Sequence, residues 1–363
     1  MVYEPRPRNS KYMITQFTKK SIKILAIETS ADDTAAAVVE NTTIISSVKH
    51  TQLEHSDWGG IVPSLAKRDH EHNIDSVVNK SLLEAGLNIS DIDAIAVTSG
   101  PGLAIALEVG IAKAKALATK YKKPLIAVNH IEGHLLSPLA NKIDISFPCL
   151  GLAVSGGHTE LILIEEIGKY KILAQTIDDA LGEAVDKAGR MLGMPYPAGP
   201  FMEKAAALGN PKKYLLPLPM AGKEDRNELS YSGLKAAFGR LVSAQKEVLS
   251  TQEINDLAAS FQNRAFEHLI RIIKKSIENF SLSTEHLLVG GGVIANQELR
   301  KRLTKMGEDL GLTVHFAPME FTGDNAAMIG IAASFKFSRG EVLSPEDFDT
   351  LDRLPRWRID TYL

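Results

Sequence analysis

Residues 22–39 read I-K-I-L-A-I-E-T-S-A-D-D-T-A-A-A-V-V, and this stretch decides the fold. Two apolar runs, Ile22 to Ile27 and Ala35 to Val39, enclose a short, polar and acidic turn. Strand-like runs around such a turn predict a β-hairpin. A third strand-like run from Thr43 to Val48 continues the meander, and strand and helix patterns alternate after it.

The same pattern begins again at Cys149. A predicted strand from Cys149 to Val154 is followed by the turn S-G-G-H-T, Ser155 to Thr159, and by a partner strand from Glu160 to Ile164. Tyr170 to Ala174 supplies a third strand, as in the first half. Two halves that each open with a hairpin predict an α/β protein with a duplicated, helix-flanked sheet. If each half forms one lobe of a clamp, each lobe can offer one turn to the phosphates of a bound nucleotide.

These halves also set the expected domain boundaries. The first lobe is expected over residues 22–148 and the second over 149–323, and a helix at about 324–345 is expected to pack back on the first lobe. A mobile basic leader is expected over 1–21. The tail over 346–363 contains Pro355 and Trp357 but shows no motif.

The composition is that of a soluble globular protein, with 363 residues, 44% apolar and 23% charged. A net charge of −3 excludes a polycationic chain, so any contact with nucleic acid needs a local basic surface. The single cysteine, Cys149, excludes an internal disulfide and suits a reducing compartment. No stretch has transmembrane length or the core of a signal peptide. We therefore expect a cytoplasmic protein without membrane contact; a mitochondrial presequence is the alternative for the leader, against which Pro5 and Pro7 argue.

Two histidines stand four positions apart in V-N-H-I-E-G-H, residues 128–134. The apolar run before them predicts a strand, and the motif itself predicts the first turn of a helix. Residues i and i+4 share one face of a helix, so His130 and His134 can bind one metal ion. One structural and one surface histidine are the alternative interpretation. The spacing does not match the peptidase motif H-E-x-x-H, because Ile131 follows the first histidine and Glu132 comes one position later.

Asp324, in F-T-G-D-N at the start of a predicted helix, is the best candidate for a third ligand. An N-cap is the alternative role for an aspartate at this position. Two imidazoles and one carboxylate leave coordination sites open for a substrate, and this mixed set suits iron or zinc.

Two glycine-rich turns are candidate phosphate contacts, because glycine lets backbone N–H groups approach a ligand closely. The first holds Gly156 and Gly157, and the second is Gly290 to Gly292, with Asn296 at a helix start. Structural turns are the alternative interpretation of both. Neither a P-loop nor a Rossmann glycine motif is present.

A series of motifs in fixed order resembles the bacterial TsaD family of tRNA N6-adenosine threonylcarbamoyltransferases, from about Ile22 to the final helix. The motifs are E-T-S-A-D-D-T, G-G-I-V-P-S-L-A-K-R-D-H, S-G-P-G-L, N-H-I-E-G-H, V-S-G-G-H-T-E-L, D-D-A-L-G-E-A-V-D-K, S-Y-S-G-L-K, G-G-G-V-I-A-N and T-G-D-N-A-A-M-I. The fold implied by the resemblance is the two-lobed, actin-like and Hsp70-like ATPase clamp (ASKHA fold). Two departures are Ala31, where many relatives have cysteine, and Ala198, which replaces a glycine.

The activity implied is transfer of a threonylcarbamoyl group from threonylcarbamoyl-AMP to the N6 amine of the adenosine 3′ of the anticodon, in tRNAs that read codons beginning with A. By the same resemblance one divalent metal, usually iron(II) with zinc possible, is held by His130, His134 and Asp324. Contacts to the adenylate are implied for Ala153, Val154, Ser155, Gly156 and Gly157, and contacts to its ribose and base for Asp186, Gly199 and Asn296. A catalytically inactive paralogue, TsaB, and a small ATPase, TsaE, are the implied protein partners.

Two acids of the first turn are catalytic candidates. Glu28 and Asp32 can orient the nucleophilic amine or an activated water, and solvated turn acids are the alternative. Candidate tRNA phosphate contacts are the lysines of residues 103–123 and Arg300, Lys301 and Arg302. Two other functions stay open at this point: a metal-dependent glycoprotein endopeptidase, a label this family once carried, and a non-catalytic nucleotide-binding scaffold.

Overall fold

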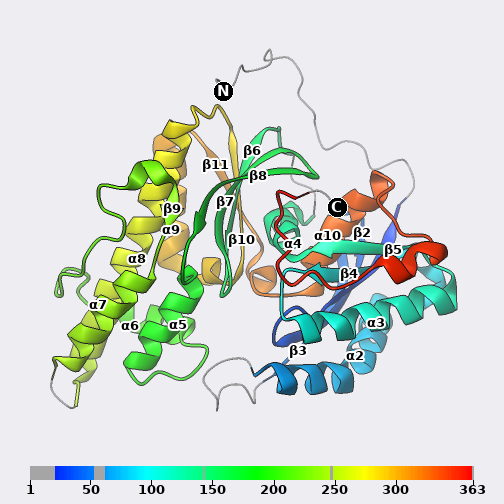
Figure 1. The fold of residues 1–363 in the computed structure, drawn as a ribbon, viewed down its shortest axis with the longest axis horizontal. Helices are drawn as coiled ribbons and strands as arrows, with labels where there is room; N and C mark the ends of the chain where they lie inside the picture. The colour runs from blue at the N-terminus through cyan, green and yellow to red at the C-terminus, as the bar shows by residue number, and fades with distance from the viewer. Residues whose placement is uncertain (1–20, 53–61, 142–143, 246–247, 362–363) are drawn as a thin grey trace.

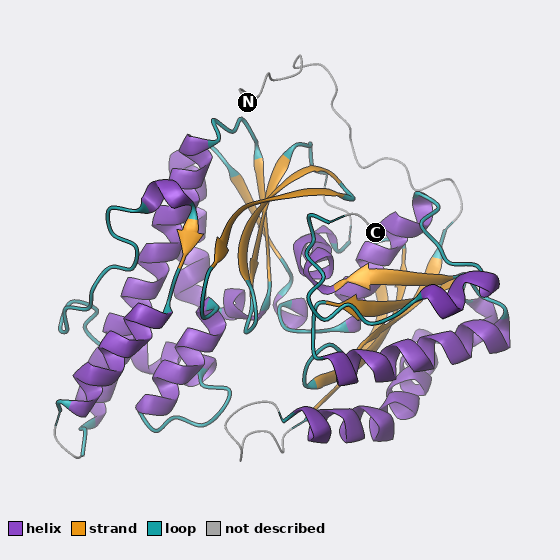
Figure 2. Cartoon of the chain, in the orientation of Figure 1, coloured by secondary structure: helices purple, strands orange, loops and turns teal. Residues whose placement is uncertain are grey.

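Two mixed β-sheets lie side by side in the computed structural model, which describes residues 21–52, 62–141, 144–245 and 248–361 (Figures 1 and 2). Residues 1–20 of the expected leader lie outside this part of the chain. The first sheet has the order β3-β2-β1-β4-β5. Its strands are β1 (Lys23–Glu28), β2 (Asp33–Glu40), β3 (Thr43–Thr51), β4 (Ala94–Gly100) and β5 (Leu125–Asn129).

The second sheet repeats this arrangement in the order β11-β10-β6-β7-β8-β9. Its strands are β6 (Cys149–Val154), β7 (Thr159–Glu166), β8 (Lys169–Thr176), β9 (Glu228–Leu229), β10 (His286–Gly290) and β11 (Thr313–Phe316). In both sheets an antiparallel meander of three strands is extended by two parallel strands beside the first one. The predicted duplicated α/β architecture is therefore confirmed, and β9 is a short addition at one edge.

The first sheet is covered on both faces because successive side chains of β1 point in opposite directions. Leu25 and Ile27 belong to an outer core with α2 (Pro63–Ala85) and α3 (Ala104–Tyr121). Ile24 and Ala26 belong instead to a central core with α4 (His130–Leu136) and α10 (Ala326–Ser338). Side chains of the second sheet enter this central core as well, so α4 and α10 pack between the two halves.

The other face of the second sheet carries a helical layer, on the left in Figure 1. Its helices are α5 (Leu181–Met191), α6 (Gly199–Ala206), α7 (Ser232–Ser243), α8 (Thr251–Asn279) and α9 (Gln297–Leu310). The longest, α8, begins at a capping box in which Ser250 and Glu253 satisfy each other's backbone N–H groups.

The final helix begins at Ala326, directly after F-T-G-D-N as predicted, but it covers only part of the expected span. Instead of spanning about 324–345, α10 ends at Ser338, because Gly340 takes a left-handed φ of 77° that an α-helix cannot contain. The chain then forms a β-bridge between Leu343 and Leu125 at the edge of the first sheet. Among the described residues, no helix is long and apolar enough to cross a membrane.

Candidate metal centre

The two histidines lie in the first turns of α4, which follows β5 without a loop. Asn129 caps this helix, and its side chain accepts hydrogen bonds from the N–H groups of Ile131 at 2.9 Å and Glu132 at 3.3 Å. His130 and His134 therefore project from one helix face, with their ring centroids 4.6 Å apart. Both are buried.

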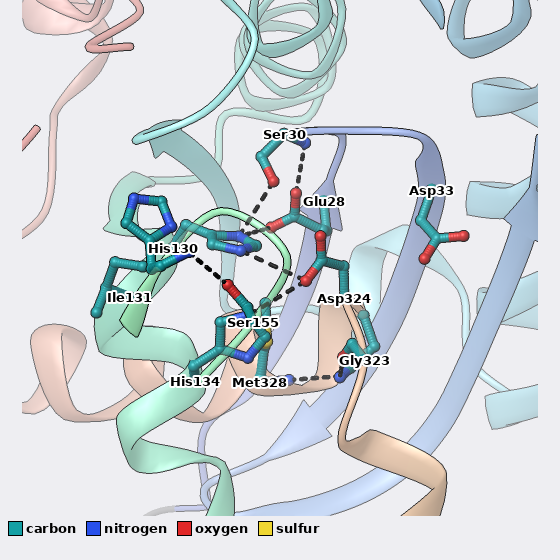
Figure 3. Close-up of polar contacts among 12 residues, drawn as sticks. Glu28, Ser30, Asp33, His130, Ile131, His134, Ser155, Gly323, Asp324 and Met328 are labelled. Atoms are coloured by element: carbon teal, nitrogen blue, oxygen red, sulfur yellow. Dashed lines mark hydrogen bonds and ion pairs between the residues drawn. The ribbon is translucent and has the colours of Figure 1, made fainter. Parts of the chain in front are cut away.

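Asp324 comes to the same place from the other end of the chain (Figure 3). Its Oδ1 atom lies 3.1 Å from Nε2 of His134 and 3.5 Å from Nε2 of His130. The N-cap of α10 is its neighbour Asn325, whose side chain accepts from the N–H of Met328 at 2.9 Å. Asp324 is thus not the cap, and its carboxylate is directed at the histidines.

These three residues could hold a metal ion, because one ligand atom from each lies within 4.8 Å of the others. Two imidazole nitrogens and one carboxylate oxygen fit the ligand preferences of iron and zinc. Burial would raise the pKa of Asp324, but His130 and His134 hold it well below its usual range. A carboxylate that stays charged inside the protein is what a cation site requires.

Glu28 contacts Nδ1 of His130, whereas Asp324 lies beside the other ring nitrogen, Nε2. Its carboxylate is buried, accepts hydrogen bonds from the Ser30 N–H and the Thr98 hydroxyl, and lies 3.1 Å from Nδ1 of His130. A carboxylate at Nδ1 favours the proton there and leaves Nε2 free to bind a metal. Burial alone would lower the pKa of His130, but Asp324 and Glu28 raise it to about 10. A metal at Nε2 would therefore displace a proton.

Asp32 has a different environment from Glu28. It is half-buried, and burial, followed by repulsion from Asp33 and Asp324, raises its pKa to about 6. Asp33 is engaged with Lys49 at 3.1 Å and with the Thr51 hydroxyl at 2.6 Å. Of the two predicted catalytic acids, Asp32 is accessible, whereas Glu28 is enclosed by its own partners.

Glu132 is directed away from the histidine pair. Its carboxylate accepts a hydrogen bond of 2.8 Å from the hydroxyl of Tyr170 in the second sheet. The arrangement differs from a metallopeptidase helix, in which the glutamate acts beside the metal.

The turn between β6 and β7 leaves room for a ligand. Ser155 closes it, because its N–H donates to the His158 carbonyl at 2.8 Å and its hydroxyl accepts from the His158 N–H at 3.1 Å. Gly156 and Gly157 are exposed, and a Cβ at either would meet no protein atom within 4 Å. Ala153 and Val154 are buried in β6 just before the turn.

The second glycine run has mainly a packing role. A Cβ at Gly290 would lie 1.9 Å from the carbonyl oxygen of His134, and a Cβ at Gly291 would lie 2.3 Å from that of Val154. Gly291 also has a φ of 103°. These two glycines let β10 approach α4 and β6 closely. Only Gly292 is exposed, so the structural alternative accounts for the first two positions.

Asp186 and Gly199, predicted to bind the adenylate ribose and base, come together at the start of α6. Asp186 Oδ1 accepts from the N–H groups of Ala198 at 2.8 Å and Gly199 at 3.0 Å. Asn296 caps α9 by accepting from the Leu299 N–H at 3.0 Å, and its amide donates to Gln262 at 2.8 Å. Asp186 therefore keeps one carboxylate oxygen for a ligand, while both ends of the Asn296 amide already have partners.

Sequence reasoning missed three features of this region. His70 of α2 holds the acidic turn, with Nδ1 2.7 Å from the Thr34 hydroxyl and Nε2 3.1 Å from the Ala31 carbonyl. His158 lies near the two histidines: burial, followed by the charges of His130 and His134, lowers its pKa to about 4. The C-terminal segment also reaches this region, and its only sequence signal is the run of arginines around Trp357.

Known proteins match this chain over most of its length. Residues 43–331 match the family model of TsaD, tRNA N6-adenosine threonylcarbamoyltransferase. A protein of that name from Pelagibacter ubique is 42% identical over 94% of this chain and 96% of its own length. Another, from Thermosynechococcus vestitus, is 44% identical over 92% of this chain and 95% of its own.

Solved structures show the same fold at much lower sequence identity. Full-length HypF in its phosphate- and nucleotide-bound form is 13% identical, with a TM-score of 0.56 over 88% of this chain and 56% of that chain. Component A of the Acidaminococcus fermentans (R)-2-hydroxyglutaryl-CoA dehydratase, also 13% identical, has a TM-score of 0.50 over 88% of this chain and all of that chain. These neighbours have the actin-like fold, which confirms the predicted ASKHA architecture.

The family match covers most of the chain, and the relatives match it nearly end to end. The chain belongs to the tRNA N6-adenosine threonylcarbamoyltransferase family and is a transferase that modifies adenosine in tRNA.

Proposed function

We propose that this transferase moves the threonylcarbamoyl group of threonylcarbamoyl-AMP to the N6 amine of the adenosine 3′ of the anticodon, in tRNAs that read codons beginning with A, and that AMP leaves as the acyl–phosphate bond breaks. The observation that carries the proposal is the convergence of His130, His134 and Asp324, whose ligand atoms lie within 4.8 Å of one another in a chain of this family. The expected metal is iron(II), with zinc as the alternative.

Each residue of the centre has a distinct task. His130, His134 and Asp324 hold the ion, which when bound would act as a Lewis acid toward the carbamoyl carbonyl. Glu28, at 3.1 Å from Nδ1 of His130, fixes the orientation of that imidazole. Asp32 is the group that holds the attacking amine and takes up its proton, because it is half-buried and Glu28 is enclosed.

The donor is expected to bind along the second lobe. The N–H groups of Gly156 and Gly157 can approach its phosphate, since the space before both glycines is free of protein atoms. Asp186 has a carboxylate oxygen left for the ribose hydroxyls beside Gly199. The proposed adenylate contacts also include Ala153, Val154, Ser155 and Asn296. Asn296 would use its remaining amide hydrogen or its backbone.

The two lobes are proposed as the functional units, residues 22–148 together with α10 on one side and 149–323 on the other. TsaB-type and TsaE-type proteins are the proposed partners, and the cytoplasm is the proposed location. Both inferences rest on the resemblance to the bacterial family.

The decisive assay combines the protein with threonine, bicarbonate, ATP, an adenylate-forming enzyme, the two partners and unmodified tRNA. Digestion and mass spectrometry should reveal N6-threonylcarbamoyladenosine in tRNAs that read A-initial codons. In a second reaction, isolated threonylcarbamoyl-AMP should give the same product without the adenylate-forming enzyme, threonine, bicarbonate and the ATP used for adenylation. No modified nucleoside in either reaction would refute the proposed donor.

A further inference from the structure

The last described part of the chain crosses from the first lobe toward the second. Residues 351–361, here called the C-terminal strap, run over β4 and β5 toward α4, in red in Figure 1. The Leu354 N–H donates to the Ser99 carbonyl at 2.7 Å, and the Gly102 N–H donates to the Pro355 carbonyl at 3.2 Å. The strap is therefore hydrogen-bonded to the end of β4 and to the S-G-P-G turn.

Two further contacts fix the strap beside the metal centre. The amide of Asn129, which caps α4, donates to the Trp357 carbonyl at 3.4 Å, and Ile359 is buried in the central core. A Cβ at Gly100 would lie 1.9 Å from the Leu354 carbonyl oxygen, so this position accepts only glycine while the strap is in place. The strap is therefore held firmly against residues that adjoin the candidate metal centre.

A cavity of about 240 Å³ lies between the strap and the two lobes. Its lining includes Pro101, Ile131, Glu160, Pro355, Arg356 and Trp357. The volume is below the roughly 300–1,000 Å³ of clefts for drug-sized ligands, so the cavity suits one group of modest size. Ile131 directly follows the ligand His130, which places the cavity next to the metal centre.

The lining residues favour a flat group that carries hydrogen-bond donors. Trp357 is half-buried and offers an aromatic face, with proline side chains nearby. No hydrogen bond to the Glu160 side chain is found among the described residues, although burial raises its pKa to about 7. Glu160 is half-buried, and its carboxylate can accept a hydrogen bond from an amine group in the cavity.

The arginines of the strap differ in whether they form ion pairs. Arg353 pairs with Glu108 at 2.8 Å and Arg358 with Asp360 at 2.9 Å. Arg356 is exposed and has no ion-pair partner in the described part of the chain. Arg300 and Arg302, predicted as phosphate contacts, already donate to the carbonyl of Ile294 and to the side chain of Glu298. Arg356 is the better candidate for a phosphate.

We propose that this cavity receives the acceptor adenine of the tRNA: Trp357 stacks on the base, Glu160 accepts the hydrogen of the exocyclic amine that Asp32 does not take up, and Arg356 contacts the adjoining phosphate. Sequence-specific RNA recognition commonly uses splayed bases stacked on aromatic side chains. This assignment rests on the family activity toward tRNA adenosine, and it is independent of which donor is used.

The first test measures binding of anticodon stem-loop RNA to the full-length chain with its two partners, by fluorescence anisotropy. Stem-loops with adenosine and with an abasic nucleotide at the modified position are compared. Trp357→Ala should weaken binding of the adenosine stem-loop about 5- to 150-fold and leave the abasic one unchanged. Trp357→Phe should bind like wild type, because it keeps an aromatic face. Equal affinity of the wild type for both RNAs would overturn the assignment.

The second test replaces adenosine with purine riboside, which lacks the exocyclic amine. The wild type should prefer adenosine by about 10- to 150-fold, the loss expected for one hydrogen bond to a charged group. Glu160→Leu should abolish the preference, whereas Glu160→Gln should keep a smaller preference of about 2- to 13-fold, because its amide oxygen accepts a neutral hydrogen bond. A preference that survives in Glu160→Leu would exclude Glu160 as the amine contact.

These tests separate the cavity from the proposed donor. A wild type that discriminates among the three RNAs but forms no product from threonylcarbamoyl-AMP would disprove the donor and support the cavity. A wild type that forms the product without discriminating among the RNAs would disprove the cavity alone. Arg353→Ala is the matched control, because it removes a strap cation that is already paired with Glu108, and it should bind all RNAs like wild type.

Discussion

The two histidines of the candidate metal centre differ in what holds them. His130 has Glu28 and Ser30, each 3.1 Å from its Nδ1 atom. Nδ1 of His134 is buried and has no hydrogen-bond partner among the described residues, and burial lowers the pKa of that imidazole. The orientation of His134 therefore depends on the packing of α4 and on Asp324 at its Nε2 atom, whereas His130 also has a carboxylate at its Nδ1 atom.

Replacing Glu28 tests this difference. Glu28→Gln should weaken metal binding about 10- to 100-fold, as removal of a carboxylate behind a metal-bound histidine generally does. Metal content after dialysis against graded free iron or zinc measures the loss, and saturating metal should restore transfer. His134→Ala should lose both metal and transfer at any metal concentration while remaining folded. Failure of excess metal to rescue Glu28→Gln would instead give Glu28 a direct part in the chemistry.

A buried histidine outside the candidate metal centre predicts how stability depends on pH. His268 of α8 accepts the Ser230 N–H at Nε2, at 3.1 Å, so its imidazole must be neutral there. Burial, followed by the charge of Arg271, lowers its pKa to about 4. The unfolded chain binds the extra proton between pH 6.5 and 4, so stability should fall by about 2–3 kcal/mol as the pH drops through that window.

Urea unfolding at several pH values would measure this effect. His268→Gln should remove the corresponding part of the slope, because the amide oxygen still accepts the Ser230 N–H and does not titrate. The exposed His72 provides the matched control, since His72→Gln should leave the slope unchanged. An unchanged slope in His268→Gln would show that other groups cause the acid sensitivity.

Among the structural elements, the two glycine-rich turns look alike in sequence but have opposite requirements. Gly290 lies against the backbone of α4, and Gly157 faces open space. Substitution of Gly290 should therefore affect packing, and substitution of Gly157 should affect ligand binding.

Gly290→Ala should destabilise the protein by about 1–3 kcal/mol, the range for an overpacked core. It should also weaken metal binding, because the added Cβ displaces the helix turn that carries His134. Thermal unfolding and metal titration would measure both effects. Gly233→Ala in α7 is a suitable control, because a Cβ there meets nothing within 4 Å and alanine favours helix.

Gly157→Ala should leave the melting temperature unchanged and raise the KM for the donor. The added methyl meets no protein atom, yet it would occupy the space proposed for the phosphate. Steady-state kinetics with isolated threonylcarbamoyl-AMP would measure the effect, with the KM for tRNA as the internal control. A donor KM equal to that of wild type would place the phosphate elsewhere.

The sequence predicts these elements better than it predicts their contacts. The i, i+4 spacing of His130 and His134 is a local property of a helix, so it was readable in advance. Asp324 and Asn325 are both good N-caps, and only tertiary structure decides which one caps α10. The sequence of the strap has no hydrophobic period, and backbone hydrogen bonds to Ser99 and Gly102 hold the strap in place. Such long-range contacts leave no local signal.

At the scale of the whole molecule, the central core joins both halves. Ile24 of β1, Ile131 of α4, Ile162 of β7, Leu288 of β10 and Ile329 of α10 belong to one buried cluster. Neither sheet can lose its partner without exposing this cluster to water. We therefore expect one cooperative unfolding transition, seen by calorimetry and by circular dichroism at the same temperature. Two separated transitions would show that the halves unfold independently.

The position of α10 in the chain has a consequence for synthesis. This helix covers β1 and β2, yet residues 326–338 follow the entire second sheet in sequence. A ribosome releases the chain from its N-terminus, so the first sheet emerges long before the helix that completes its inner face. Ile24, Ala26 and Val39 lack that cover during the interval. We therefore expect the nascent first lobe to expose these apolar side chains until the second lobe and α10 have been translated.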